Sequence, residues 1–163
     1  MNTRPGLMSL MTALVIGLCL HAACAWAEEG VSTPDAVAKK FTQAYYMLDS
    51  GMADFLSTDA LTNENDVNMV DLFLRVRQNE ALNRGYQLSY LQMYPILIKA
   101  EVTEVSEETA TVEVKTTALR SINPLYRMVG YVFGLIQEHD FDTTLTLVKE
   151  DGEWKVGPGA LAI

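Results

Sequence analysis

Length, composition and charge set the first limits on this chain. Its 163 residues are 49% hydrophobic and 20% charged, which is enough apolar content to fill the core of one domain and excludes a chain that is disordered throughout. The formal net charge of −9 argues against a nucleic-acid-binding protein, because neutralising phosphates needs a concentrated basic surface and none is visible.

Residues 1–27 have the features of an export signal. Arg4 precedes a long apolar run without a charged residue, and residues 25–27 (AWA) fit the small-residue cleavage pattern. We therefore expect residues 28–163 to form the mature protein as a single domain, on the periplasmic or cell-envelope side of a membrane. Two alternatives stay open, an uncleaved membrane anchor and a lipid anchor on Cys24.

Removing that segment excludes several kinds of chemistry. Both cysteines lie within residues 1–27, so the mature domain has no disulfide, no cysteine metal ligand and no cysteine nucleophile. His139 is its only histidine, and no G-x-S-x-G motif is present. The stretch 138–142 (EHDFD) resembles a set of metal ligands, but adjacent acids before a strand are usually solvated. We expect neither a metal nor a cofactor.

The first half of the mature chain is predicted to be helical. A helix begins at Pro34, with Thr33 as its N-cap, and ends at Gly51. A short helix over residues 52–57 and a longer one over residues 66–84 follow it. The apolar residues of the first helix recur at helical spacing and predict one buried stripe: Val37, Phe41, Ala44, Tyr45 and Leu48.

After the third helix, apolar residues alternate with polar ones, which predicts β-strands. Residues 86–90 (YQLSY) show this alternation, and Pro95 indicates an edge strand or a bulge. Two longer strands follow over residues 96–105 and 110–119. In the second of these, we expect the core-facing residues to be Ala110, Val112, Val114 and Ala118.

The last hairpin is the sharpest local signal. Strands over residues 141–149 and 153–156 flank residues 151–152 (DG), a pair suited to a two-residue hairpin turn. Such a turn places Leu147 opposite Val156, so that both side chains lie on the core face of the sheet.

The segment between the late strands follows a helical pattern. A helix that begins at Pro124 and continues to residue 137 is apolar on nearly every side, so we expect it to be buried against the sheet. The alternative is an exposed helix that contacts a partner or a membrane surface, with Gly130 and Gly134 allowing close approach. Its candidate contact residues are Met128, Val132 and Phe133.

Helices followed by antiparallel strands predict an α+β fold. The helix TPDAVAKKFTQAYYMLDSG, the segment MADFLS, the hairpin AEVTEVSEETATVEVKTTA and the ending TLTLVKEDGEWKV together resemble the nuclear-transport-factor-2-like superfamily. The resemblance covers most of residues 33–157. It implies a cone-shaped, cystatin-like fold, in which helices pack on a curved antiparallel sheet, here with an extra apolar helix between late strands. Dimers through the outer sheet face are common in this superfamily. Membership of the superfamily does not imply any one activity.

The resemblance also implies an apolar pocket between the first helix and the sheet. Tyr45, Tyr90 and Tyr94 are the candidate lining residues, because each offers an apolar face and a hydrogen-bonding tip. The alternative is that they are ordinary core aromatics whose hydroxyls reach the surface.

An isomerase- or cyclase-type site would need a carboxylate base and a hydroxyl that holds a developing oxyanion. Asp49 or Asp54 could act as the base, and Tyr46 or Tyr45 as the donor, although no local catalytic motif supports them. Both acids lie near helix ends or in polar segments, where a solvated carboxylate is the ordinary case.

The sequence therefore favours an exported, non-catalytic domain that binds a small apolar ligand or a protein partner of the cell envelope. One alternative is an isomerase- or cyclase-like enzyme with an Asp base and a Tyr donor. Another is an adaptor that docks through helix 124–137. Membrane contact through the N-terminal segment or through helix 124–137 stays open, as does a homodimer.

Overall fold

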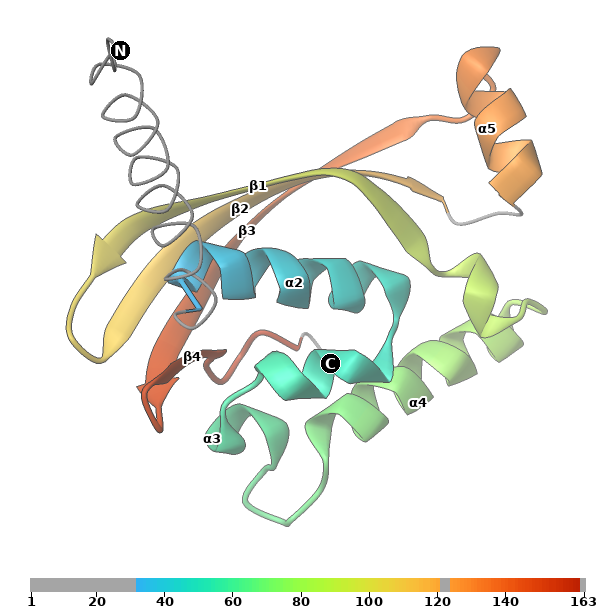
Figure 1. Ribbon diagram of the computed structural model, residues 1–163. Coiled ribbons are helices and arrows are strands. Elements are labelled where there is room, and N and C mark those ends of the chain that lie inside the picture. The colour runs from blue at the N-terminus through green and yellow to red at the C-terminus, as the bar shows by residue number, and fades with distance from the viewer. Residues whose placement is uncertain (1–31, 121–123, 162–163) are drawn as a thin grey trace, which may run out of the picture. The chain divides into compact units, whose positions relative to one another are not determined.

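The computed structural model describes residues 32–120 and 124–161 (Figure 1). The predicted export signal lies outside these residues. The helical elements that come first are α2 (Pro34–Met47), the 3₁₀ helix η1 (Ser50–Phe55), α3 (Thr58–Leu61), α4 (Met69–Asn83) and the 3₁₀ helix η2 (Leu88–Tyr90). The elements that follow are β1 (Met93–Val105), β2 (Thr109–Arg120), α5 (Pro124–Val132), β3 (Glu138–Glu150) and β4 (Glu153–Val156).

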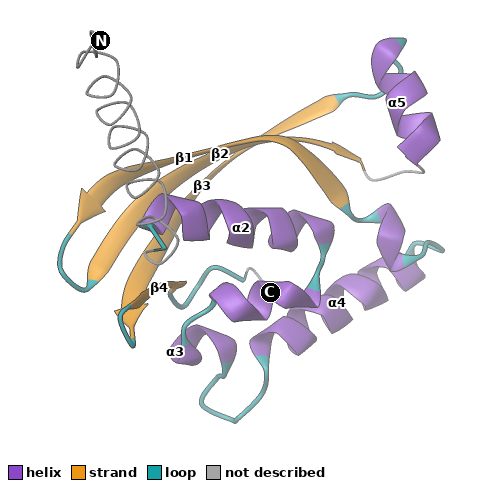
Figure 2. Ribbon diagram, viewed as in Figure 1, coloured by secondary structure: helices purple, strands orange, loops and turns teal. Residues whose placement is uncertain are grey.

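The four strands form one antiparallel sheet in the order β1-β2-β3-β4, with β1 at an edge. Figure 2 shows the sheet arching over α2, with α4 on the far side of α2 from the sheet. The register of β1 shifts between Pro95 and Leu97, so Pro95 lies on an edge strand at a bulge, as predicted. The predicted α+β fold, with helices on a curved antiparallel sheet and an extra helix between late strands, is confirmed.

The core lies between α2, α4 and the inner face of the sheet. Phe41 of α2 and Phe73 of α4 are buried there, as is Leu147 of β3, which pairs with Val156 as the hairpin predicted. The predicted core-facing residues of β2 are all buried: Ala110, Val112, Val114 and Ala118. Asp151 and Gly152 both have positive φ, which suits the two-residue turn of this hairpin.

Helix α2 ends earlier than its sequence predicts. Leu48 adopts a left-handed conformation with φ 52°, and its N–H donates to the carbonyl of Tyr45, so the helix stops at Met47 rather than at Gly51. Leu48 packs against the core, and this burial offsets the cost of a left-handed conformation in a residue other than glycine. Gly51 instead belongs to η1, where its N–H donates to the side chain of Asp49 at 2.9 Å.

The prediction of a strand over residues 86–90 is wrong. Leu88–Tyr90 form the 3₁₀ helix η2, and the rings of Tyr86 and Tyr90 stack with their centroids 4.2 Å apart. The alternation of apolar and polar residues therefore reflects a local aromatic contact, and the sheet begins only at Met93.

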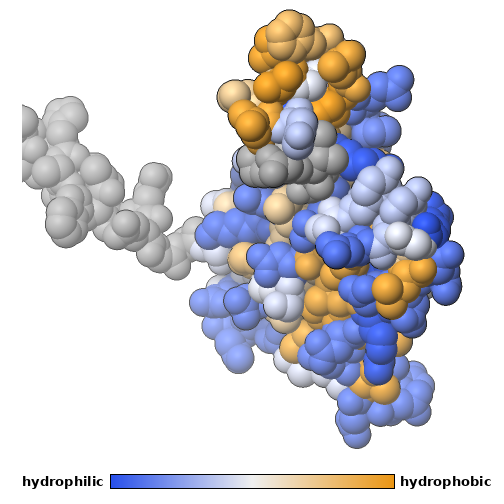
Figure 3. Space-filling model, turned by 90° about the vertical axis from the view of Figure 1, so that its right-hand side faces the viewer, coloured by the Kyte–Doolittle hydropathy of each residue, from blue (hydrophilic) through white to orange (hydrophobic). Residues whose placement is uncertain are grey.

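The expectation that the late apolar helix is buried is also wrong. Seven large apolar side chains between Tyr126 and Leu135 are 40–78% exposed. Figure 1 shows α5 at the end of the sheet, apart from α2 and α4, and Figure 3 shows the apolar surface that it presents. Across the described part of the chain, no helix is both long enough and apolar enough to cross a bilayer.

Candidate functional site

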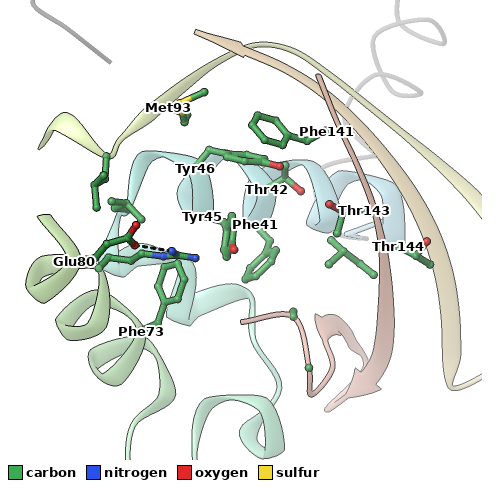
Figure 4. Close-up of a pocket in the computed structure, with 16 residues that line it drawn as sticks. Phe41, Thr42, Tyr45, Tyr46, Phe73, Glu80, Met93, Phe141, Thr143 and Thr144 are labelled. Carbon is green, nitrogen blue, oxygen red and sulfur yellow. Dashed lines mark hydrogen bonds and ion pairs between the residues drawn. The ribbon is translucent and has the colours of Figure 1, made fainter. Parts of the chain in front are cut away.

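A cavity of about 500 Å³ lies between the C-terminal half of α2, helix α4 and strand β3 (Figure 4). Helix α2 contributes Phe41, Tyr45 and Tyr46 to its wall, α4 contributes Phe73, and β3 contributes Phe141. With aliphatic residues such as Leu48 and Met93, these aromatic side chains make the wall predominantly apolar, which is typical of a site for an apolar small molecule.

The aromatic side chains form a continuous contact chain across the cavity. The ring of Tyr45 stacks on Phe73 of α4 with centroids 5.1 Å apart, and it meets the ring of Tyr46 edge-on at 5.4 Å. Tyr46 in turn lies 5.0 Å from the ring of Phe141 in β3. Neighbouring residues of a helix point about 100° apart, so Tyr45 reaches α4 while Tyr46 reaches the sheet.

Two groups of polar side chains line the cavity. The hydroxyls of Thr42, Tyr46 and Thr143 lie on the side toward the sheet (Figure 4). Burial raises the pKa of Tyr46 above its ordinary value of 10.0, although a hydrogen bond with Thr143 acts in the opposite direction. The phenol therefore stays protonated at neutral pH and can donate a hydrogen bond inside an apolar wall.

The second group of polar side chains is a charged cluster on α4. Arg77 Nη1 lies 3.0 Å from Glu80 Oε2, and Arg84 Nη2 lies 2.9 Å from Glu80 Oε1. The guanidinium of Arg77 also lies 5.2 Å from the centroid of the Phe73 ring. Arg77 and Glu80 are about one-third exposed and line the cavity, so they form a charged rim that is accessible to solvent.

The structure separates the three tyrosines proposed as lining residues. Tyr45 lies in the cavity wall, whereas Tyr90 and Tyr94 lie outside it. Tyr90 and Tyr94 are partly exposed, and each packs beneath an arginine: the guanidinium of Arg120 is 4.9 Å from the Tyr90 centroid, and that of Arg127 is 3.9 Å from the Tyr94 centroid.

The carboxylates of the alternative enzyme site are not in the cavity. Tyr46 lines it, but Asp49 and Asp54 are exposed and do not. The Asp49 carboxylate caps η1 instead, and Asp54 is joined to β4 through its carbonyl oxygen, which accepts from Lys155 Nζ at 3.0 Å. The carboxylate that does line the cavity belongs to Glu80. Its spacing of three residues from Arg77 places both on one helix face, but the sequence does not reveal that this face borders a cavity.

The acidic stretch at the start of β3 shows no metal-binding arrangement. Asp140 Oδ1 accepts a hydrogen bond from Thr117 Oγ1 at 2.7 Å across the β2–β3 pair. Within residues 32–120 and 124–161, no three side chains of the types that ligate metals gather closely enough to hold an ion.

No protein-family model matches the sequence, and no curated protein matches it. Three solved structures are similar in fold. A Campylobacter jejuni protein provisionally named an NTF2-like transpeptidase is 15% identical with a TM-score of 0.45, and the match covers 77% of this chain and 98% of that one. An NTF2-like protein of unknown function from Shewanella oneidensis MR-1 is 16% identical with a TM-score of 0.43, over 74% of this chain and 88% of that one.

The third is a Xanthomonas campestris protein provisionally named a calcium/calmodulin-dependent protein kinase II association domain. It is 13% identical with a TM-score of 0.44, over 78% of this chain and 86% of that one. In this chain the helices lie on one face of a curved antiparallel sheet, the arrangement that the sequence resemblance implied.

Proposed function

We propose that this domain binds a small, predominantly apolar ligand in the cavity between α2, α4 and β3. The observation that carries the proposal is the cavity itself: about 500 Å³ of space with a mainly apolar wall that includes five aromatic side chains. Ligand sites have volumes of about 300–1,000 Å³ and combine apolar walls with a few placed polar groups. The volume and the wall both meet this description.

The polar groups define the ligand further. An apolar body would fill the space beside Phe41 and Tyr45, while the hydroxyls of Tyr46 and Thr143 could orient one oxygen or nitrogen of the ligand. The charged rim at Arg77 and Glu80 would suit a polar end group that stays in contact with water. The class that fits these features is an amphipathic molecule with a single polar end.

A binding role fits the geometry better than the enzyme alternative does. A proton-transfer site needs a base within hydrogen-bond reach of the reacting group. Asp49 and Asp54 do not line the cavity, and Glu80 is held by two arginines at its rim. The tyrosine hydroxyls of the wall, on Tyr45 and Tyr46, therefore suit recognition of a ligand better than proton transfer. From residues 1–27 we further propose that binding takes place on the cell-envelope side.

The test is native mass spectrometry of the protein isolated gently from its own cell envelope. We expect a stoichiometric extra mass of a small molecule on a chain that begins at Glu28. The variant Thr42→Phe adds a ring on the buried, cavity-lining face of α2 and should lose this mass. The matched control Gln43→Phe adds the same ring on the exposed side of the same helix and should keep it.

Two results would contradict the proposal. One is a folded wild-type chain that carries no extra mass and also fails to take up 1-anilinonaphthalene-8-sulfonate, an amphipathic probe with one anionic end. The other is a ligand or probe that Thr42→Phe retains as strongly as Gln43→Phe does, since a ligand bound there cannot share its space with the new ring.

A further inference from the structure

The exposed residues of the segment that joins β2 to β3 form a second surface, separate from the cavity. We name residues 125–136 the α5 tip. It comprises most of α5 and the turn that follows the helix, and it presents the apolar surface seen in Figure 3. A contiguous apolar surface of this kind on a folded monomer is typical of an interaction site.

The α5 tip is an ordered structure with its own contacts. Gly134 has φ +66° and ends the helix, with its N–H donating to the Tyr131 carbonyl and the Leu135 N–H donating to the Gly130 carbonyl at 2.7 Å. The side chain of Ile136 folds back over Gly130, where an added Cβ would come within 2.7 Å of it. Both glycines are therefore used within the chain, and Gly130 is not available as a groove for a partner helix.

Apolar exposure covers most of the circumference of this helix. Met128, Val129 and Val132 are exposed on one side with Tyr126 and Tyr131 flanking them, whereas Arg127 lies over the Tyr94 ring and Gly130 is covered by Ile136. A protein partner with a rigid surface covers one face of a helix and leaves the rest wet. The interface of a bilayer can take up a broad apolar arc while a charged side chain such as Arg127 stays among the headgroups, so the wide exposure favours lipid as the occupant.

Charge supports the same occupant. Residues 121–137 contain no Asp or Glu in a chain whose net charge is −9, and their only charged residue is Arg127. Arg120 is the last residue of β2, just before the segment that leads to the tip. The guanidinium groups of Arg120 and Arg127 each lie over a tyrosine ring. Acidic residues resume at Glu138, where β3 begins, so the tip is weakly cationic while the strand below it is acidic. Tip-to-tip contact between two copies would bring like charges together, which disfavours a second copy as the occupant.

We propose that the α5 tip inserts into the interface of a lipid bilayer with anionic headgroups. Its apolar side chains enter the boundary between headgroups and acyl chains, while Arg120 and Arg127 lie at the depth of the lipid phosphates. Tyr126 and Tyr131 suit the same boundary, because each combines an apolar ring with a polar tip. Glu138 and the acids after it stay in water and limit the depth of insertion.

The test measures binding to vesicles of phosphatidylethanolamine and phosphatidylglycerol by co-sedimentation. The variant Val132→Glu changes a 72% exposed residue of the tip. The control Val105→Glu makes the same change at the last residue of β1, which is 65% exposed and pairs with Ala110 at the opposite end of the sheet. We expect Val132→Glu to lower the partition coefficient by at least about tenfold and Val105→Glu to change it by less than about twofold. Binding to phosphatidylcholine vesicles should be weaker than binding to the anionic ones.

A second readout keeps the test independent of the N-terminal segment, which would be the same in all three chains. We expect amide hydrogen exchange of residues 124–136 to slow when vesicles are added to the wild-type chain and to stay unchanged in Val132→Glu. Equal partitioning of Val132→Glu and Val105→Glu, or no protection of the tip, would overturn the proposal. So would light scattering that shows a wild-type dimer and a Val132→Glu monomer, since a second copy would then cover the tip. None of these results depends on whether the cavity holds a ligand.

Discussion

Phe73 is the side chain whose removal tests most directly how α4 is held against α2. It is 1% exposed, and its ring stacks on Tyr45 with centroids 5.1 Å apart. Replacing a buried Phe by Ala costs about 3–5 kcal/mol, from lost burial and from the cavity that remains. Because a cavity already lies beside Phe73, neighbouring side chains can move into the vacated space, which places the cost at the lower end of this range. We therefore expect Phe73→Ala to lower the free energy of unfolding by about 3 kcal/mol.

Urea unfolding measures this loss, and Leu82→Ala provides the control. Leu82 belongs to the same helix but is 60% exposed, so its truncation should change stability by less than about 0.5 kcal/mol. A domain of this size has a total stability of about 5–15 kcal/mol, so Phe73→Ala should still fold, with a clearly lower midpoint. A loss below about 1 kcal/mol, or one equal to that of Leu82→Ala, would show that α4 does not depend on this aromatic contact.

Three further predictions concern pH and backbone conformation. Hydrogen bonds from the Thr58 side chain and N–H lower the pKa of Glu150, so the stability that its carboxylate contributes is present above the ordinary Glu pKa and is lost as pH falls through the lowered value. Urea midpoints of Glu150→Gln should therefore fall less than those of the wild type on acidification, and parallel curves would exclude the contact. Tyr46→Phe should lower the free energy of unfolding by about 1 kcal/mol at pH 7, because it removes the hydrogen bond of the Tyr46 hydroxyl. This difference from the wild type should shrink above pH 10, because the raised pKa of Tyr46 means that the unfolded chain ionises before the folded one and the wild type loses stability. Gly152→Ala should lower stability by about 1 kcal/mol in thermal unfolding, because Gly152 has φ +85°, and an unchanged melting temperature would contradict this account of the turn.

The parts of the fold that the sequence predicted are those set by local rules. The two-residue turn at Asp151 and Gly152 fixes the register of the last hairpin, and with it the pairing of Leu147 with Val156. The buried stripe of α2 follows from its spacing alone, because an amphipathic helix has only one face to bury. By contrast, the end of α2 depends on the packing of Leu48 against the core. Such tertiary contacts cannot be predicted from the residues that are adjacent in sequence.

The candidate site was harder to predict because it joins distant elements. Tyr45 lines the cavity because it lies on the buried stripe of α2, which the cavity borders. Asp49 lies outside the cavity because a short acidic side chain after a helix can accept from a local N–H, here that of Gly51. Glu80 was not singled out, because only the packing of α4 beside α2 brings it to the cavity rim.

The exposure of α5 follows from a mismatch of lengths that hydrophobicity alone does not reveal. A helix that is apolar on all sides is usually buried, but burial needs a second element that reaches it. The 14 residues of α2 span about 21 Å at 1.5 Å per residue, whereas the 12 residues of β2 span about 40 Å at 3.3 Å per residue. Even aligned with the strand, α2 would leave one end of the sheet uncovered. The pairing of β2 with β3 continues to Leu119 and Glu138, so α5 begins beyond the last paired residues and beyond the reach of α2. At that position α5 contacts the sheet through Arg127, which lies over the Tyr94 ring, while its large apolar side chains stay exposed.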